Sequence, residues 1–199
     1  MPATQAPHLP YSVARIRPMA DRPRRIPRPL DAPRLEELAL SYVARFATSA
    51  AKVDGYLRRK LRERGWEGEG DPGVAALVER FVAAGYIDDE AYARSKTGSL
   101  LRRGYGQRRV AQALGAAGIA EEVRAAVAPD GPARRQAALA LARKRRLGPF
   151  GVGPADRAAR EKQLAAMLRA GHPLDSAREL VNAATVEAAE AWAAGSEDE

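Results

Sequence analysis

Apolar residues recur every three to four positions through most of the chain, which is the period of an amphipathic helix. The first three stretches of this kind cover residues 35–46, 53–64 and 74–84. Glycine follows the second and the third, at positions 65 and 85. No stretch alternates β-branched and polar residues as a strand would. The spacing therefore predicts an opening unit of three helices.

The second helix of this unit recurs further along the chain. Its apolar positions and its final glycine reappear 53 residues later, and the matched series are Leu57, Leu61, Gly65 and Val110, Leu114, Gly118. A further step of 53 residues reaches Met167 and Gly171, although the third apolar position slips from Gln163 to Leu164. Each such glycine suits the left-handed residue that ends a helix. A third helix follows Gly118 and Gly171, at 121–127 and 175–181. Repeats of about 50 residues are typical of stacked supersecondary units.

We therefore expect an all-α protein of about nine helices, arranged as three tandem three-helix repeats in an elongated, curved array with flexible tails. The expected repeats cover residues 31–85, 86–130 and 131–185. A disordered basic arm rich in proline and arginine is expected over residues 1–30, and an acidic tail over residues 186–199. The alternative is a compact helical bundle whose matching glycines are coincidental helix ends.

The composition favours a polyanionic partner. The 199 residues include 33 basic and 25 acidic side chains, for a net charge of +8. Such an excess suits nucleic acid, an anionic membrane or an acidic protein surface. The absence of cysteine excludes disulfides and thiolate zinc sites. No apolar run is long enough to span a membrane, and the first residues do not resemble a secretory signal, so a cytoplasmic location with no membrane contact is expected.

The sequence offers little material for catalysis. Of the two histidines, His8 lies in the basic arm and His172 precedes a proline, where we expect a surface or half-buried loop residue. The acidic triplet at 88–90 predicts a helix cap and not a metal site, because consecutive helical side chains fan out by about 100°. No phosphate-binding loop or nucleophile motif is present. We expect no catalytic residue, no metal, no cofactor and no enzyme.

Basic residues gather in every predicted repeat. The three clusters are Arg58, Arg59, Arg62; then Arg102, Arg103, Arg108, Arg109; then Arg143, Lys144, Arg145, Arg146. The second cluster brackets Gly104-Tyr105-Gly106, where one helix ends and the next begins, so its four arginines are presented around one tight corner. Recurring cations predict a periodic positive surface, suited to a polyanion or to a filament with its own repeat. Solvated helix faces without a role are the alternative.

The corner belongs to a longer recognisable pattern. GYIDDEAYA at residues 85–93 and SLLRRGYGQRRVAQALGAAGI at 99–119 resemble the central repeat of the RecX family, the bacterial regulators of the RecA recombinase. The pattern combines an acidic cap, a paired-glycine corner and a helix of fixed apolar spacing. Further segments are similar to the opening and closing repeats of the family; they are ALSYVAR at 39–45, YLRRKLRERG at 56–65, RKRRLGPF at 143–150 and LAAMLRAG at 164–171.

Three features depart from the family pattern. Residues 48–52 read TSAAK, where the family has Arg-Ser, two further residues and Glu, so half of a capping box is lost and a charge is reversed. Gly55 weakens the same helix, and Gln107 replaces the proline that usually follows the corner. These departures concern the second helix of the first repeat and any partner contact made there.

The resemblance implies an all-helical, non-catalytic regulator without a cofactor that lodges in the groove of the RecA–DNA filament, and we expect a monomer. There it would inhibit filament growth, ATP turnover, strand exchange and the RecA-stimulated cleavage of the SOS repressor. Single- and double-stranded DNA are the weaker or indirect partners. The corner arginines are then the first candidates for filament or DNA contact, followed by the first cluster and the third. A general DNA-binding module independent of RecA and a structural adaptor remain the alternatives.

Overall fold

The computed structural model describes residues 28–153 and 156–195, so most of the expected basic arm and the last acidic residues lie outside it. Within the described residues the chain forms ten α-helices, one short 3-10 helix and no strand, which confirms the all-α expectation. The helices are α1 Ala32–Val43, α2 Ala50–Arg64, α3 Val74–Ala83, α4 Asp89–Arg102, α5 Gln107–Gly115, α6 Glu121–Ala126, α7 Gly131–Arg145, η1 Gly148–Phe150, α8 Arg157–Arg169, α9 Leu174–Asn182 and α10 Val186–Ala194. None of them is long and apolar enough to cross a bilayer.

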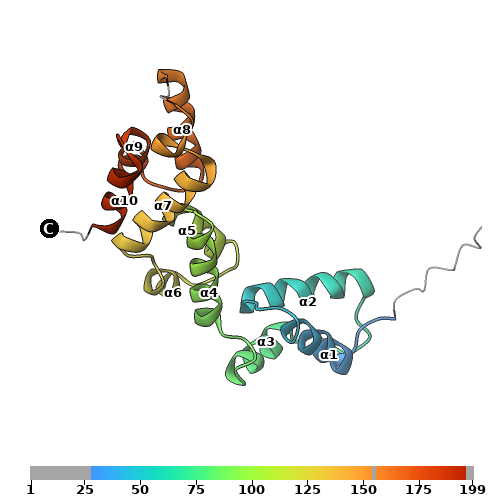
Figure 1. Cartoon of the computed structure of the whole chain (residues 1–199). Coiled ribbons are helices and arrows are strands. Elements are labelled where there is room, and N and C mark those ends of the chain that lie inside the picture. The colour runs from blue at the N-terminus through green and yellow to red at the C-terminus, as the bar shows by residue number, and fades with distance from the viewer. Residues whose placement is uncertain (1–27, 154–155, 196–199) are drawn as a thin grey trace, which may run out of the picture.

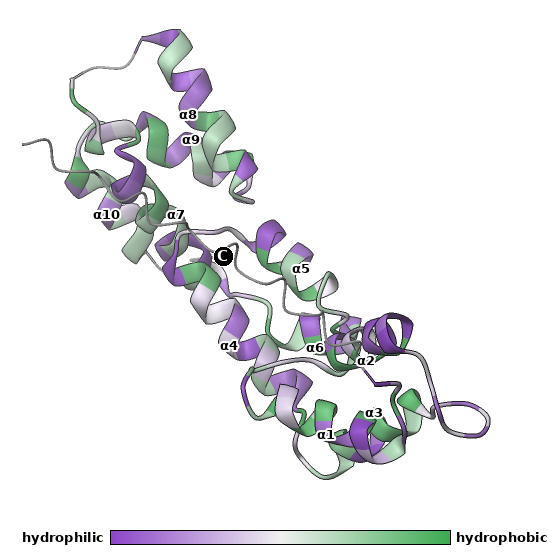
Figure 2. Cartoon of the chain, turned by 90° about the vertical axis from the view of Figure 1, so that its right-hand side faces the viewer, coloured by the Kyte–Doolittle hydropathy of each residue, from purple (hydrophilic) through white to green (hydrophobic). Residues whose placement is uncertain are grey.

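The helices form three units that follow one another along an elongated molecule (Figures 1 and 2). Unit one holds α1–α3, unit two holds α4–α6 and unit three holds α7–α10. Each unit has a separate apolar core, built around Leu57 in unit one, Leu114 in unit two and Met167 in unit three. Leu114 and Met167 occupy equivalent positions of the 53-residue repeat, and Leu57 lies one helical turn before that position, so the repeat places the second helix of every unit in its core.

Short polar residues and glycines set the helix ends. Five helices begin with a side-chain cap in which the oxygen accepts from a backbone N–H three residues later; the caps are Asp31, Asp88, Asp130, Asp156 and Thr185. Gly65, Gly118 and Gly171 have φ angles of 83°, 70° and 97°. The repeated glycines therefore do adopt the left-handed conformation, which only glycine reaches at no steric cost.

The irregular stretch after α7 explains why the repeat slips in unit three. Gln163, which replaces the expected apolar residue, accepts through Oε1 from Gly148 N at 2.8 Å. A Cβ at Gly148 would lie 2.2 Å from the carbonyl oxygen of Leu180, so the chain passes α9 where no side chain fits. The apolar pattern is therefore interrupted at Gln163 because its side chain holds this stretch by a hydrogen bond.

The first unit begins earlier than expected. Leu30, assigned to the basic arm, is fully buried, donates from N to Gly65 O at 3.0 Å and accepts at O from Glu67 N at 2.8 Å. This isolated bridge ties the chain to the end of α2. Ile87, expected in the second unit, packs into the core of the first. Single apolar residues outside a periodic stretch gave no helical signal, and for this reason both boundaries were misplaced.

The last helix was also missed. Residues 186–194, expected in the acidic tail, form α10, so ten α-helices are present and not about nine. Ala189 and Ala193 are buried in the core of unit three, and α10 contacts α7. Alanines four residues apart form only a weak apolar stripe, and the neighbouring Glu187 and Glu190 give this segment an acidic composition.

Candidate binding surface

The corner between α4 and α5 is a tight turn with helix ends on both sides. Arg102 is the last residue of α4 and Arg103 its C-cap. Gly104 follows with a φ of 83°, and Gly106 is the N-cap of α5. The break in the helical pattern therefore serves as expected to end one helix and begin the next.

The corner also docks on unit three. Gly106 N donates to Ala170 O at 2.9 Å, and Arg108 N donates to Gly171 O at 3.2 Å. A Cβ at Gly106 would lie 2.4 Å from the carbonyl carbon and oxygen of Gly171, so only glycine permits this approach. The paired glycines thus fix one unit against the next, in addition to presenting the arginines.

His172 completes this contact and corrects our expectation. It is only 1% exposed, and its Nε2 donates to Gly104 O at 3.0 Å. Burial lowers the pKa of His172, although the hydrogen bond to Gly104 acts in the opposite direction. The 53-residue repeat could have predicted this burial, because His172 lies 53 residues after Ile119, which is buried in the core of unit two.

The four corner arginines are exposed to solvent, where a partner could contact them. Arg102, Arg103, Arg108 and Arg109 all lie on the surface. Within residues 28–153 and 156–195, none of them forms an ion pair with an acidic side chain. The Arg103 guanidinium lies 5.3 Å from the centroid of the Tyr105 ring. Tyr105 is half-buried and packs against the cores of units two and three, so it does not project from the tip of the corner.

The first cluster is partly neutralised within its own helix. Arg58, Arg59 and Arg62 are exposed in the second half of α2. Arg58 pairs with Asp54 at 2.8 Å, which raises the pKa of the guanidinium, and Arg59 pairs with Glu63 at 3.6 Å. This cluster is therefore a weaker attractor of anions than the corner.

The third cluster adjoins the corner. Arg143, Lys144 and Arg145 occupy the last turn of α7, and all are exposed. Arg143 pairs with Glu190 of α10. Leu141 contacts the corner so closely that a Cβ at Gly104 would lie 2.8 Å from its backbone N. Because residues three and four apart are neighbours on a helix, Lys144 and Arg145 lie one turn beyond this contact.

Arg146 follows α7 directly and is the last basic residue of the third cluster. It is exposed and is the C-cap, with a left-handed φ of 54°. The third cluster therefore lies at the end of the helix that contacts the corner, whereas the first cluster lies on unit one.

A groove between α4 and α5 opens beside the corner. Its lining residues are Lys96, Leu100, Arg103, Tyr105, Arg109, Gln112, Ala113 and Ala116. Lys96 and Gln112 lie outside the three basic clusters predicted from the sequence. Their spacing was the available signal, since Lys96 lies seven residues before Arg103 and Gln112 three residues after Arg109. Both spacings place residues on one helix face.

Two residues of the acidic triplet cap helices, and Glu90 forms an ion pair with Arg94. Asp88 Oδ1 accepts from Ala91 N at 2.8 Å at the start of α4. Asp89 Oδ1 accepts from Ala50 N at 2.9 Å and so caps α2 of the preceding unit. Within the described residues no group of three histidine or acidic side chains is placed to hold a metal ion.

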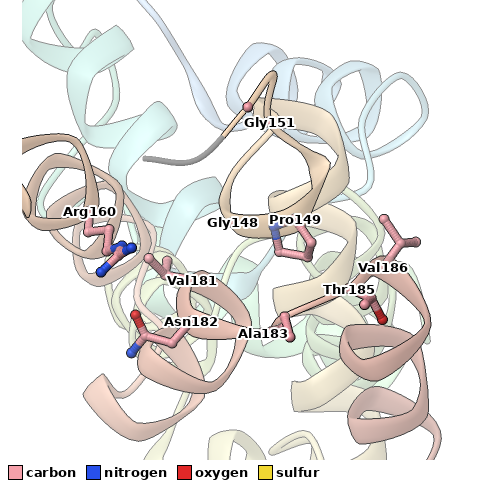
Figure 3. A pocket seen from close by; sticks show the side chains of 11 residues that line it. Gly148, Pro149, Gly151, Arg160, Val181, Asn182, Ala183, Thr185 and Val186 are labelled. Atoms are coloured by element: carbon pink, nitrogen blue, oxygen red, sulfur yellow. The ribbon is translucent and has the colours of Figure 1, made fainter. Parts of the chain in front are cut away.

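A hollow in unit three carries no cluster of reactive groups (Figure 3). It lies between η1, the start of α8 and the α9–α10 connection, and among the described residues Arg160 is its one ionisable lining residue. Thr185 faces it and caps α10 by accepting from Ala188 N at 3.1 Å. The arrangement does not form a nucleophile, a general base or a ligand set.

Comparison with known proteins agrees with this architecture. A family model described as RecX, second three-helix domain, matches residues 88–127, which include α4–α6. A regulatory protein RecX from Myxococcus xanthus is 35% identical over 165 residues, covering 78% of this chain and 88% of the relative. The chain belongs to the RecX family.

Other RecX proteins support the same assignment. A regulatory protein RecX from Thermus thermophilus is 39% identical over 108 residues, or 54% of this chain and 71% of the relative. The crystal structure of RecX from Lactobacillus salivarius matches with a TM-score of 0.61 at 16% identity, covering 75% of this chain and 94% of that one. At that identity the crystal structure supports the fold.

Proposed function

We propose that this RecX chain is a non-enzymatic regulator that binds in the groove of the RecA–DNA filament. It limits filament growth, ATP hydrolysis, strand exchange and the co-protease activity of the SOS response. The observation that carries the proposal is the corner, where four exposed arginines that form no ion pair with any described residue are fixed at the contact of two units. Membership of a family of regulatory proteins supports it.

The elongated shape gives a physical route to inhibition. A chain of three units can contact successive subunits of a filament, and each further contact is intramolecular, which raises the effective concentration. A regulator bound across neighbouring subunits opposes the rearrangements that accompany ATP turnover. The protein acts as a monomer in this proposal, with RecA as the main partner and DNA as the secondary one.

The basic residues contribute unequally. The corner arginines contact the filament or its DNA first, and Lys144, Arg145 and Arg146 extend that surface along unit three. Arg58 and Arg59 contribute less because their charge is shared with Asp54 and Glu63. Arg62 and Arg143 complete the proposed set.

The test is the rate of ATP hydrolysis by RecA on single-stranded DNA while the protein is titrated in. We expect inhibition by the native chain and at least a tenfold higher inhibitory concentration for the variant with alanine at the four corner positions, Arg102, Arg103, Arg108 and Arg109. The matched control carries alanine at four exposed arginines elsewhere, Arg80, Arg94, Arg157 and Arg178, and should inhibit nearly as well. Equal losses in both variants would show that only net charge matters.

A general DNA-binding module is the second candidate, favoured by the same four exposed arginines. It predicts tight binding to bare DNA and no effect on RecA. Binding to bare DNA should therefore be followed in parallel. Loss of ATPase activity at concentrations that leave the DNA unbound supports filament regulation, whereas DNA binding with unchanged ATPase activity supports the alternative.

A further inference from the structure

An aromatic hollow lies at the joint between units one and two. It is lined by residues 43–48, where α1 ends, and by residues at and near the start of α4. Its volume is about 360 Å³, within the range of about 300–1,000 Å³ that is typical of ligand-binding clefts. Phe46 and Tyr86 line the hollow and are 56% and 58% exposed. Exposed apolar surface of this kind is typical of a binding site.

The two exposed rings are held in position by other rings. The centroids of Phe46 and Tyr42 lie 5.3 Å apart, and those of Tyr86 and Phe81 lie 5.4 Å apart. Because each exposed ring already packs against a neighbour, an occupant of the hollow would restrict little side-chain freedom that is not already lost. The hollow therefore offers an apolar surface that is formed before anything binds.

The hollow also carries one charge of each sign. Arg45 and Asp88 both line it, and both are exposed. Arg45 forms no ion pair with any residue that the structure describes. Asp88 uses Oδ1 to cap α4, and Oδ2 faces no donor among the described residues. The fitting occupant has apolar side chains, a cation and a carboxylate.

The beginning of this chain has that composition. Residues 1–27, which lie outside the described part, contain six prolines, five arginines and a single acidic residue, Asp21. Proline-rich segments bind aromatic-lined grooves, because proline favours an extended backbone and so lowers the entropy lost on binding. A tethered segment also has an effective concentration on the order of millimolar, so weak contacts are sufficient to hold it.

The length of α1 indicates which part of this arm reaches the hollow. The arm joins unit one at Leu30, which is bonded to Gly65 beside the start of α1, and the hollow begins at Val43, where α1 ends. The 12 residues of α1 span about 18 Å, which about six residues of an extended proline-rich chain cover. Counting back from the first described residue, residues 16–23, IRPMADRP, arrive at the hollow.

We propose that residues 16–23 occupy this hollow and hold the N-terminal arm across the joint between units one and two. Pro18 and Met19 pack against the exposed faces of Phe46 and Tyr86. The arm thereby covers the apolar surface of the joint and adds a contact between the two units. The proposal goes beyond the proposed function, since it concerns a contact within one chain.

The direction of the arm sets the ionic contacts. Asp21 is nearer the point of attachment and meets Arg45 at the end of α1. Arg17 is further along the arm and meets Asp88 at the start of α4. The single acidic residue of the arm is therefore paired with the cation of the hollow, and a basic residue of the arm with its carboxylate.

The test uses the full chain and paramagnetic relaxation in NMR spectra. Because the chain has no cysteine, Ala20→Cys gives one attachment point for a nitroxide label. We expect the label to broaden the amide signals of Ala47, Ala91 and Ser95, which line the hollow. Signals of α9 and α10, in unit three, should be unaffected. An arm that makes no contact with the hollow would broaden signals around Leu30 instead.

Matched variants test the aromatic rings. Phe46→Ser with Tyr86→Ser should remove most of the broadening at the hollow. Val152→Ser with Leu174→Ser changes two exposed large hydrophobic residues of unit three and should leave it unchanged. All four side chains are exposed, so neither variant is expected to unfold the protein, and circular dichroism checks that the helices are retained.

A charge exchange tests the ionic contact. Asp21→Arg and Arg45→Asp should each weaken the broadening at the hollow, and the two together should restore it. The control combines Asp21→Arg with Arg178→Asp, an exposed position on α9, and should not restore it. Rescue by the first pair alone shows a contact at this position and not a general effect of charge.

Three results would overturn the proposal. They are a native chain without broadening at the hollow, equal losses in the hollow and control variants, and broadening that passes between molecules. The last is detected by mixing nitroxide-labelled protein with isotope-labelled protein that carries no nitroxide, and it would identify a second copy as the occupant. The experiment contains no RecA, so its failure leaves the proposed function standing.

Discussion

The joint between units one and two is made by side chains, whereas the joint between units two and three is made largely by the backbone. In the first joint, Ser49 Oγ donates to Ala117 O at 2.5 Å. Asp89 caps the start of α2 from the neighbouring unit, and Lys52 Nζ donates to the Tyr92 hydroxyl at 2.6 Å. The cores of these two units share no residue.

In the second joint, Gly106 and Arg108 donate from the backbone to the carbonyls of Ala170 and Gly171. His172 adds a buried hydrogen bond, and Tyr105 packs against the cores of both units. Units two and three therefore form one continuous body. Unit one is attached to that body through side-chain hydrogen bonds and through the close approach of Ala51 to Gly118.

The two joints use equivalent positions of the 53-residue repeat. Ala117 and Ala170 lie 53 residues apart, and both accept a hydrogen bond from the cap residue at the start of the previous unit's second helix. The cap is Ser49 in one joint and Gly106 in the other. The presence or absence of a side chain at this one position decides whether the units meet through a hydroxyl or through the backbone itself.

The largest loss of stability should come from a substitution that places a side chain where the backbones of units two and three meet. Gly106→Ala places a Cβ against the Gly171–His172 peptide and should destabilise the protein by about 1–3 kcal/mol, as overpacking does. Gly55→Ala is the matched control, since nothing lies within 4 Å of its Cβ position. It should stabilise α2 by about 0.5–1 kcal/mol. Urea denaturation followed by circular dichroism measures both, and changes of the same sign in the two variants would contradict this account.

The same joint should be sensitive to pH through His172. Burial lowers the pKa of His172 in the folded protein, so the unfolded chain takes up a proton first as the pH falls. Stability should therefore decrease as the pH is lowered through the ordinary histidine value of about 6.5. His172→Gln should remove this part of the dependence while retaining a donor for Gly104 O, and His8→Gln should leave it unchanged. Urea midpoints between pH 7.5 and 5.5 provide the measurement, and an identical pH profile in the His172 variant would refute the assignment.

Much of the fold could be predicted from the sequence because its signals are local. The 3.6-residue period located α1, α2 and α3, and left-handed glycines such as Gly118 ended helices where expected. The burial of Leu30 and the formation of α10 were not predicted, because both depend on contacts with helices that are distant in the sequence. Their burial is a tertiary effect that no local pattern specifies.

The site was predictable to a lesser extent. The exposure of the corner arginines followed from their positions outside the apolar stripe. The pairing of Arg58 with Asp54 was readable as a spacing of four residues, but that of Arg143 with Glu190 joins residues 47 apart. Nor could the sequence show that Gly106 meets Gly171, because that contact depends on how two units dock.

The side-chain joint should respond more moderately than the backbone joint. Ser49→Ala removes the donor to a buried carbonyl and should cost about 1 kcal/mol, and Asp89→Ala should cost a similar amount by removing a helix cap. Ser99→Ala, on α4 and away from this contact, is the control for serine replacement and should have little effect. Urea denaturation tests these values, and a loss at Ser49 as large as that at Gly106 would remove the distinction between the joints.

The smallest effect concerns the pair formed by Lys52 and Tyr92. The ammonium donates to the hydroxyl and lies 4.7 Å from the ring centroid, so Lys52→Met and Tyr92→Phe remove the same hydrogen bond from its two ends. A double-mutant cycle should give a coupling of about 0.5 kcal/mol. Lys60→Met, combined with Tyr92→Phe, should give no coupling, because Lys60 pairs with Glu63 within α2. A measurable coupling would show that Lys52, which stands where the family has Glu, makes a contact between units one and two. Zero coupling would leave Ser49 and Asp89 as the side chains that hold unit one in place.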